Sequence, residues 1–351
     1  MHFSLRTCVT PAALFLVTIG VLPARSDPPK ENVPAKGAAT LEQAPKAAER
    51  GLAFLEKDAA AWKKQRKCAT CHHGTMTVWA LSEGKAQGYP VKKETLADTV
   101  TWTKERLKGI DKPRDPRPGW KMVSTPAIYL AVMALTVPKQ DALSAAELKQ
   151  IAGHLFRHQE SDGSWSWASA PAQNRPPPVF ESDEVATLLA SAALAPHVPK
   201  DPKAKSEARA SREKAAAWLA KTKPTHTTQA LLLWLLSDVQ AGQPPKKIQE
   251  RITTILGRQN KDGGWGQVQG LASDAYATGQ VLYFLGWAGV KKDRGEIQRA
   301  VSFLVAHQKE DGSWPMKSRA HPGAKPSTSP VPITHLGSAW ATMGLMRIVP
   351  R

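Results

Sequence analysis

Two cysteines and a histidine near the amino end of the chain have the spacing of a covalent haem site. Cys68 and Cys71 lie three residues apart, and His72 follows directly, in the segment KCATCHHG at 67–74. In a CxxCH motif the two thiols attach to the haem vinyl groups, and the histidine binds the iron as an axial ligand. The sulfurs project from one helical turn, with the histidine beneath the porphyrin. The motif therefore predicts a haem c held by Cys68, Cys71 and His72.

Two other interpretations of these residues stay open. In an oxidising compartment Cys68 and Cys71 would be able to form a disulfide, but a disulfide gives no reason for His72 to follow. A zinc site would need two further ligands, which His72, His73 or other histidines would have to supply. No cysteine follows residue 71, and Cys8 lies in a segment that we expect to be removed.

The amino end has the pattern of a secretory signal peptide, which we assign to residues 1–26. Arg6 precedes an uncharged stretch over 11–22, and small residues follow up to Ser26. We therefore predict export to the periplasm or the extracellular space, with no integral membrane segment after cleavage. Residues 27–45 are rich in Pro, Lys and Ala and predict a flexible leader. A single folded domain is then expected over 46–351.

The charge of the chain limits the kinds of partner. The chain has 48 basic and 30 acidic residues, a formal net charge of +18 at pH 7. The basic residues are spread over loops and form no stripe with interleaved aromatic residues, which a nucleic-acid site normally needs. We expect no nucleic-acid partner, and attribute the charge to solubility or to loose attraction of acidic partners.

A repeated motif organises the rest of the chain. The segments HLFRHQESDGSWSW at 154–167, TILGRQNKDGGWGQ at 254–267 and FLVAHQKEDGSWPM at 303–316 share an apolar helical stripe followed by QxxDGxW. The motif recurs at a period near 50 residues, which accommodates two helices per unit. Asp-Gly is expected to end each helix, because glycine accepts the left-handed turn. The motif residues are Gln159, Trp165, Gln259, Trp265, Gln308 and Trp314.

Two kinds of helix alternate along the chain. Amphipathic helices are predicted around residues 47–60, 94–107, 145–158, 212–220, 246–258 and 295–307. Mostly apolar helices are predicted to begin at Thr75, Ser124, Ser182, His226, Ser273 and Gly337. A helix that is apolar on most faces must be buried on most faces. The pattern therefore predicts an all-α ring with the apolar helices inside.

The QxxDGSW and QxxDGGW segments resemble the QW repeat of squalene-hopene and oxidosqualene cyclases. A similar repeat builds the β subunits of protein prenyltransferases. The resemblance covers roughly residues 47–349 and implies an α/α toroid in which the Gln and Trp side chains tie neighbouring outer helices together. It implies function less directly, because one fold hosts several chemistries. A standard triterpene cyclase uses two such domains, whereas this chain can build one.

The resemblance also suggests a catalytic acid. Squalene-hopene cyclases protonate their substrate with a DxDD motif at the start of an inner helix, and the sequence Glu181-Ser182-Asp183-Glu184 falls in the matching register. Asp183 would then be the proton donor. Helix capping is the simpler explanation, since Ser273-Asp274 repeats Ser182-Asp183 in another unit. The prenyltransferase zinc site is not expected, because it needs a cysteine beyond residue 71.

The haem motif takes the place of the QW loop in the first unit. The haem is therefore expected at the mouth of the ring, where the inner helices begin. Met76, His226 and His335 are candidates for the second axial ligand, whereas His154, His158 and His307 are expected at the solvated surface of outer helices. Inner aromatic residues are expected to form core or to line a cavity for an apolar ligand: Trp79, Tyr129, Trp234, Tyr276, Tyr283, Phe284 and Trp340.

Three functions agree with these observations. The first is an exported haem protein on a cyclase-like toroid, acting with a redox partner or as a ligand sensor. The second is an enzyme that binds an isoprenoid or other apolar small molecule in the ring, with Asp183 or the haem as its reactive centre. The third is a repeat scaffold for another protein, in which Cys68 and Cys71 form a disulfide.

Overall fold

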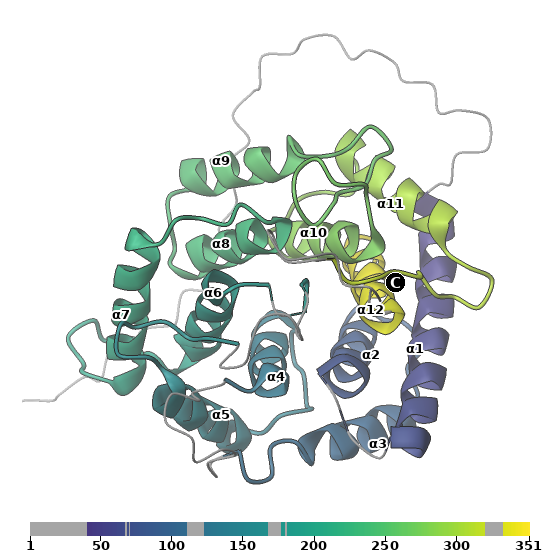
Figure 1. Ribbon diagram of the computed structural model, residues 1–351. Coiled ribbons are helices and arrows are strands. Elements are labelled where there is room, and N and C mark those ends of the chain that lie inside the picture. The colour runs from purple at the N-terminus through teal and green to yellow at the C-terminus, as the bar shows by residue number, and fades with distance from the viewer. Residues whose placement is uncertain are drawn as a thin grey trace, which may run out of the picture. The chain divides into compact units, whose positions relative to one another are not determined.

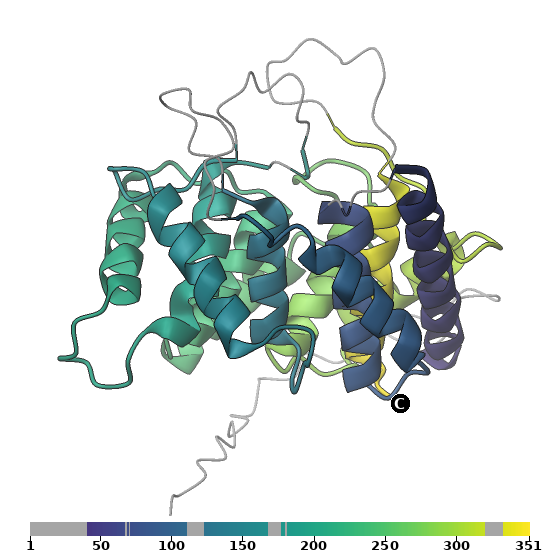
Figure 2. The same cartoon turned by 90° about the horizontal axis from the view of Figure 1, so that it is seen from below.

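Twelve α-helices form two concentric layers in the part of the chain that the computed structural model describes (Figure 1). That part comprises residues 41–66, 69, 71–110, 123–167, 177–179, 181–319 and 333–351. The predicted signal peptide and most of the predicted leader lie outside it. Viewed from the side, the helices stand next to one another around the ring (Figure 2).

Outer and inner helices alternate strictly along the chain, so each pair contributes one helix to each layer. The outer layer consists of α1 (Ala44–Arg66), α3 (Lys93–Lys104), α5 (Ala145–His158), α7 (Glu207–Lys221), α9 (Pro245–Leu256) and α11 (Gly295–His307). The inner layer consists of α2 (Met76–Ala86), α4 (Thr125–Thr136), α6 (Asp183–Leu194), α8 (Thr228–Gln240), α10 (Ala275–Trp287) and α12 (Thr334–Ile348). The predicted all-α toroid of six helical pairs is confirmed.

The inner helices are buried around most of their circumference, as their composition predicts. Every residue of α10 from Ala275 to Leu285 is buried. This helix packs most closely against α12, where a side chain at Gly279 or Gly344 would collide with the backbone of the facing helix. Glycine at these two positions lets the last two inner helices approach each other.

The glutamine of each QxxDGxW loop connects the outer helix before the loop to the next outer helix around the ring. Gln308 Nε2 donates to the carbonyl of Gly312 in its own loop (3.0 Å) and to the carbonyl of Ala47 in α1 (2.8 Å). Because α1 and α11 are the first and last outer helices, this bond closes the ring. Equivalent bonds run from Gln159 to Ser211 in α7 and from Gln259 to Glu296 in α11.

The tryptophans of the same loops connect the outer layer to the inner layer. Trp314 is buried, its indole N–H donates to the carbonyl of Leu304 (2.8 Å), and its backbone N–H donates to Ser338 Oγ in α12 (2.9 Å). Trp165 and Trp265 repeat this arrangement with Thr187 and Thr278. Each loop therefore fixes three helices at once.

Glycine is required in these loops for two reasons. Gly312 has a φ of 86°, a region that other residues rarely adopt. A Cβ atom at this position would also run into the backbone carbonyl of Arg50 in α1. Gly163 and Gly263 have the same conformation and face Lys214 and Arg299 in the same way.

Three expected boundaries are wrong by a few residues. The first helix begins at Ala44, inside the predicted leader, because Ala44 is already buried and the preceding 3₁₀ turn Leu41–Gln43 packs against α11. Helix α7 begins at Glu207 rather than near residue 212, since Ser206 caps it. Helix α12 begins at Thr334 rather than Gly337, which places His335 within its first turn.

His154 also differs from expectation. It was expected at the solvated surface, but it is buried, with 4% of its area exposed. Its Nε2 accepts the backbone N–H of Ser124 (3.0 Å), and its Nδ1 lies 3.1 Å from the carbonyl of Ile110. The imidazole on α5 therefore connects Ile110, which follows α3, to Ser124, which directly precedes α4.

Replacing Gln308 by leucine should weaken ring closure. The substitution removes both hydrogen bonds of Nε2 and leaves the buried carbonyls without their donor, so we expect a loss of roughly 1–3 kcal/mol in the free energy of unfolding. Chemical denaturation followed by circular dichroism measures this. The matched control is Gln298→Leu on the exposed face of α11, which should stay within about 0.5 kcal/mol of wild type; equal losses in the two variants would contradict the assignment.

Candidate functional site at the ring mouth

The predicted haem motif leads directly into the first inner helix. Cys71–Thr75 forms a π-helical turn that continues into α2. Cys68 and the side chain of Cys71 lie outside the described residues, so the structure does not test how the two thiols are used. The Nε2 atom of His72 is buried and has no hydrogen-bond partner. Burial, together with the neighbouring His73 and His335, lowers the pKa of His72 to about 4.

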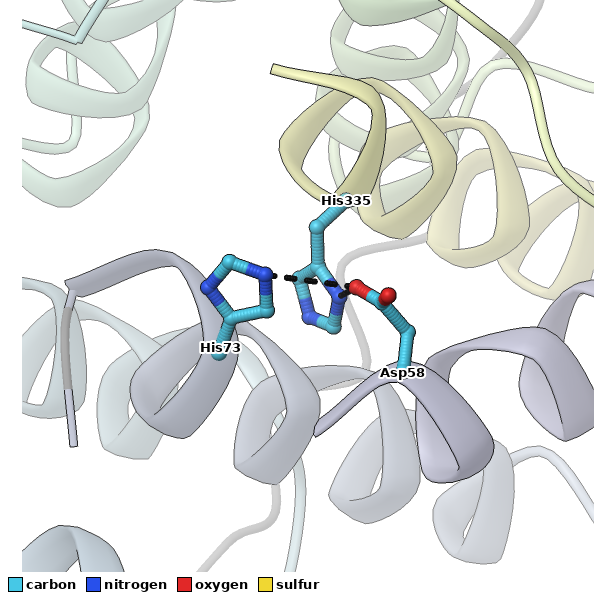
Figure 3. A group of neighbouring side chains, drawn as sticks. All are labelled: Asp58, His73 and His335. Carbon is cyan, nitrogen blue, oxygen red and sulfur yellow. Dashed lines mark hydrogen bonds and ion pairs between the residues drawn. The ribbon is translucent and has the colours of Figure 1, made fainter. Parts of the chain in front are cut away.

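Next to this turn, Asp58, His73 and His335 converge from three separate elements (Figure 3). Asp58 lies on α1, His73 in the π-helical turn, and His335 on α12. Asp58 Oδ2 lies 2.7 Å from His335 Nδ1 and 3.2 Å from His73 Nε2. One ligand atom from each residue lies within 4.8 Å of the other two. These three residues are called the His-His-Asp cluster below.

Two neighbours hold the imidazoles of this cluster in place. Thr77 Oγ1 donates to the carbonyl of His73 (2.7 Å) and lies 3.0 Å from Nε2 of His335. Trp62 stacks on the ring of His73, with 4.0 Å between the ring centroids. The side chain of His335 is only 3% exposed, whereas that of Asp58 is 37% exposed. The cluster is therefore rigid on one side and open to solvent at Asp58.

Burial and the contacts within the cluster together set the charges of its members. Burial would raise the pKa of Asp58, but its contacts with His335 and His73 outweigh this and hold the pKa well below its usual value. Burial lowers the pKa of His335 to about 4, although contact with Asp58 opposes the shift. At neutral pH the carboxylate is therefore ionised and the imidazole of His335 is neutral.

Sequence reasoning singled out two members of this cluster separately, and Asp58 not at all. His335 was considered only as a second iron ligand, and His73 only as a zinc ligand. The other candidates for that second ligand are a buried methionine, Met76, and an exposed histidine, His226. Asp58 carried no local signal, because only ring closure brings α1 next to α12.

A second polar group occupies the mouth beside α10. Asp274 caps this helix, since Oδ1 accepts the backbone N–H of Ala277 (2.8 Å), and its Oδ2 accepts from Gln267 (2.9 Å). The sequence predicted that Ser273 would open the helix, but Ser273 instead donates to Asp262. Burial raises the pKa of Asp274 to about 6, against the opposing effect of these hydrogen bonds.

Gln267 connects Asp274 to a buried ion pair. Its Oε1 accepts from Arg319 Nε (3.1 Å), and the guanidinium of Arg319 pairs with Glu181. Both side chains of this pair are largely buried, 15% exposed for Arg319 and 4% for Glu181. Arg319 balances the negative charge of Glu181. Asp274 is therefore the acid of this group that stays uncharged up to mildly acidic pH.

The predicted catalytic acid, Asp183, is exposed in the first turn of α6. Ser182 caps this helix by accepting the N–H of Val185 (3.2 Å). The neighbouring Glu184 is buried and accepts hydrogen bonds from Thr225 and from the indole of Trp234. Ser182 therefore has the helix-capping role. Glu181 and Glu184 on either side of this position are buried, whereas Asp183 is exposed.

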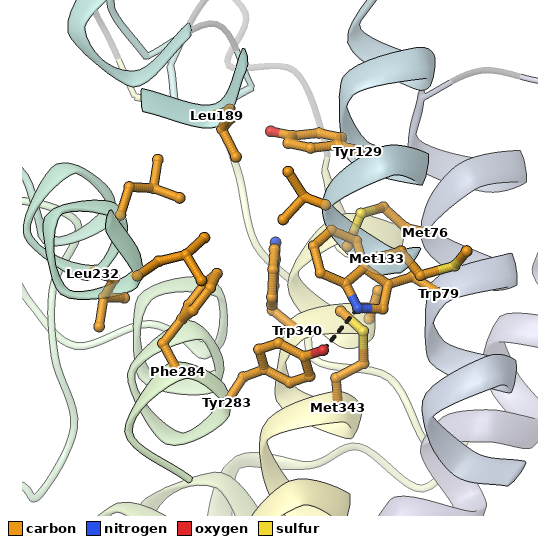
Figure 4. Packing of buried hydrophobic residues seen from close by; sticks show 14 of the residues in the cluster. Met76, Trp79, Tyr129, Met133, Leu189, Leu232, Tyr283, Phe284, Trp340 and Met343 are labelled. Carbon is orange, nitrogen blue, oxygen red and sulfur yellow. Dashed lines mark hydrogen bonds between the residues drawn. The ribbon is translucent and has the colours of Figure 1, made fainter. Parts of the chain in front are cut away.

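Below the mouth, aromatic side chains fill the middle of the ring (Figure 4). Trp79, Tyr283 and Trp340 pack edge to face, with ring centroids 5.1 to 5.8 Å apart. Trp79 donates to the hydroxyl of Tyr283 (3.0 Å), which donates to Thr136 (2.9 Å). The expected aromatic core is present among these residues.

Several buried polar atoms of the inner helices have no hydrogen-bond partner, and one of them belongs to this aromatic group. The indole nitrogen of Trp340 is buried and has no hydrogen-bond partner. In Figure 4 it points into the middle of the ring, toward Tyr129 and Leu189. A buried donor without an acceptor costs about 1–3 kcal/mol.

Comparison with known proteins relates part of this chain to the squalene-hopene cyclases. The family model of the squalene-hopene cyclase C-terminal domain matches residues 219–349. The squalene–hopene cyclase of Zymomonas mobilis is 27% identical over 125 residues, and a probable squalene–hopene cyclase of Sinorhizobium fredii is 31% identical over 124 residues. These matches cover 36% and 35% of this chain, and 19% of each relative. The similar region thus spans about a fifth of the relatives' length.

Solved structures share the fold over most of the chain. The type II terpene cyclase MstE from Scytonema has a TM-score of 0.53 at 13% identity, with 87% of this chain and 98% of that chain covered. Its complex with the product merosterolic acid A gives 0.52 at 15% identity, with 88% and 97% covered. A UGL variant with dGlcA-Glc-Rha-Glc gives 0.55 at 15% identity, with 87% and 96% covered. At these identities the likeness shows the α/α toroid alone.

None of the described helices combines the length and the apolar character needed to cross a bilayer.

The stability of the protein should fall as pH rises through the range in which Asp274 loses its proton. The folded carboxyl keeps its proton up to about pH 6, whereas the unfolded one ionises near its usual value of 3.8. Folding therefore takes up a proton between these values, and the stability due to protonated Asp274 is present below pH 4 and lost by pH 6. The shift corresponds to a loss on the order of 2 to 3 kcal/mol.

The measurement is urea denaturation at several pH values for wild type and Asp274→Asn. Asparagine keeps the cap but cannot titrate, so the difference between the two proteins should change across this window. Asp183→Asn, at the exposed start of α6, is the matched control and should run parallel to wild type. A difference for Asp274→Asn that is independent of pH would show that the carboxyl is ionised throughout.

Proposed function

We propose that this protein is a terpenoid-cyclase-like enzyme that takes an isoprenoid or similar apolar molecule into its ring and protonates it from Asp274. The single observation that carries the proposal is a partly buried acid of raised pKa at the mouth, two residues before the aromatic interior begins at Tyr276. A carboxyl that keeps its proton up to about pH 6 is the kind of group that protonation of an alkene needs.

The surroundings of Asp274 suit a proton donor. Its two oxygens are held by the start of α10 and by Gln267, so its orientation is fixed. The pair of Glu181 and Arg319 sits beyond Gln267, and Glu181 is neutralised by its partner. Proton transfer from Asp274 would leave a carboxylate beside a helix N-terminus and near Arg319, and both favour the negative charge.

The interior suits the carbocation that such a protonation creates. Tyr276, two residues beyond Asp274, lies 6.4 Å from Trp340 between ring centroids, and further aromatic rings surround Trp340. Aromatic faces stabilise nearby cations through their quadrupoles. The unpartnered indole nitrogen of Trp340 would also gain an acceptor from a ligand that carries an oxygen atom at this depth. An oxygenated isoprenoid would therefore fit better than a pure hydrocarbon.

The comparisons support this proposal over the other uses of the fold. The family match over residues 219–349 covers α8 to α12, and it therefore includes Asp274. The similar UGL structure shows that fold likeness alone does not select a substrate class. Acid and aromatic residues together favour isoprenoid chemistry.

The test is incubation of the purified chain with squalene and with an oxygenated linear isoprenoid, followed by mass spectrometry of the products. We expect conversion by wild type and a loss of at least a hundredfold in Asp274→Asn, which keeps the helix cap but carries no proton to give. Asp293→Asn at the surface is the control. A loss confined to Asp183→Asn would return the role of the acid to the residue that the sequence predicted.

We also propose that the CxxCH motif holds a covalent haem c, because one structural observation favours it. The axial ligand that the motif predicts, His72, has a buried Nε2 without a hydrogen-bond partner, and an iron ion would coordinate this nitrogen. Covalent attachment outside the cytoplasm would agree with the predicted signal peptide. The haem would then supply electron transfer or ligand binding beside the ring mouth.

This second proposal is tested by expressing the chain in a host that exports it and matures c-type cytochromes. We expect a Soret band and a haem-stained band on a denaturing gel in wild type, and loss of the stained band in a Cys68→Ser, Cys71→Ser double variant. His307→Gln on the outer surface should keep both signals. A wild-type chain without haem under these conditions would remove the proposal and leave the disulfide as the use of the two cysteines.

A further inference from the structure

We propose that the His-His-Asp cluster of Asp58, His73 and His335 binds a divalent transition-metal ion of the zinc type. The site is separate from both functions proposed above, since it uses neither Asp274 nor His72. Two imidazoles and one carboxylate are a donor set that zinc and related ions favour. The proposal rests on which ring nitrogen of His335 carries the hydrogen atom, and on the distances between the possible ligand atoms.

The position of the hydrogen on His335 follows from Thr77. A threonine hydroxyl has one hydrogen, and Thr77 gives it to the carbonyl of His73, which can only accept (2.7 Å). The contact of Thr77 Oγ1 with His335 Nε2 at 3.0 Å must then be a bond in which Nε2–H donates. A neutral His335 consequently has its lone pair on Nδ1.

That lone pair faces a carboxylate. His335 Nδ1 lies 2.7 Å from Asp58 Oδ2, and a carboxylate oxygen is an acceptor as well. Two acceptors at this distance repel each other unless a positive charge lies between them. Either a proton or a metal ion would supply that charge, and the metal titration described below distinguishes the two.

His73 directs its Nε2 toward the same oxygen, 3.2 Å away. A proton between Asp58 and His335, together with a hydrogen bond from His73 Nε2–H to the same oxygen, would also account for these contacts. One metal ion would instead join all three side chains at a single point. Zinc lies about 2.0–2.2 Å from nitrogen and oxygen ligands, so two ligands of one ion are about 3–3.5 Å apart. The two contacts of Asp58, 2.7 and 3.2 Å, come within a few tenths of an ångström of this spacing, and the third donor separation lies within 4.8 Å.

The neighbours have the roles of outer ligands in a metal site. A metal-bound histidine usually donates its other ring N–H to an oxygen, which fixes the ring and its tautomer, as Thr77 does for His335. Stacking on Trp62 fixes the ring of His73. The exposed side of Asp58 leaves the remaining coordination positions open to water, as in zinc sites with three protein ligands.

The test is a zinc titration of the purified full chain after treatment with chelator, read by calorimetry and by elemental analysis. It is done on the Cys68→Ser, Cys71→Ser background, so that thiols cannot bind the ion, and again on the chain with any attached haem, where iron and zinc are counted separately. We expect one zinc per chain in both. Affinity should fall at least tenfold in Asp58→Asn and in His335→Gln, and by roughly 10–100-fold in Thr77→Val.

The control is His307→Gln, an exposed histidine on α11 that should bind zinc as wild type does. Circular dichroism in the presence of chelator checks that each variant folds. If a variant does not fold, the visible absorption of Co²⁺ added to the thiol-free chain decides, because a site of nitrogen and oxygen donors gives bands that the free ion lacks. No zinc and no such bands, or equal zinc binding in His335→Gln, would overturn the proposal and leave a proton shared between Asp58 and His335.

Discussion

The hydrogen bond from Gln308 to the carbonyl of Ala47 joins the last outer helix to the first, and the mouth of the ring depends on that closure. Helix α1 also packs directly against α12, and together these contacts bring Asp58 to His335 across 277 positions of the sequence. The same kind of bond occurs at the other two loops, but the bond of Gln308 is the one that connects the two ends of the fold. Ring closure thus brings together residues that are far apart in the chain.

The two layers of helices differ in how much of each helix is buried. Outer helices present one apolar stripe and tolerate solvent on the other face, whereas inner helices are buried nearly all around. Every polar group that enters the interior must therefore find a partner there. Glu83 does so with Arg347, and the hydroxyl of Tyr283 does so with Thr136 and Trp79.

The mouth differs from these paired groups of the interior. Asp274 is partly buried and has a raised pKa, His72 has an unpartnered ring nitrogen, and two imidazoles of the His-His-Asp cluster share one oxygen of Asp58. Each of these arrangements costs free energy in the protein alone. Such costs gather where a ligand, a proton or an ion is to be received. All three lie where inner helices begin.

The sequence by itself determined the helices, their order and the loops between them, because these depend on neighbours a few residues away. The spacing of apolar residues distinguished inner from outer helices, and Gln-x-x-Asp-Gly-x-Trp identified the loops. The cysteine motif was placed correctly before the first inner helix for the same reason. Helix boundaries shifted by a few residues where burial, as at Ala44, or capping, as at Ser206, extended a helix.

Only the tertiary structure decided which polar residues are buried and what they meet. Asp183 and Asp274 follow a serine in the same local pattern, yet one is exposed and the other is enclosed by Gln267 and the residues beyond it. Asp58 has no distinguishing neighbours in the sequence and gains its partners from α12 and the turn before α2. Burial and charge at a site depend on what other segments contribute, and no local pattern carries that information.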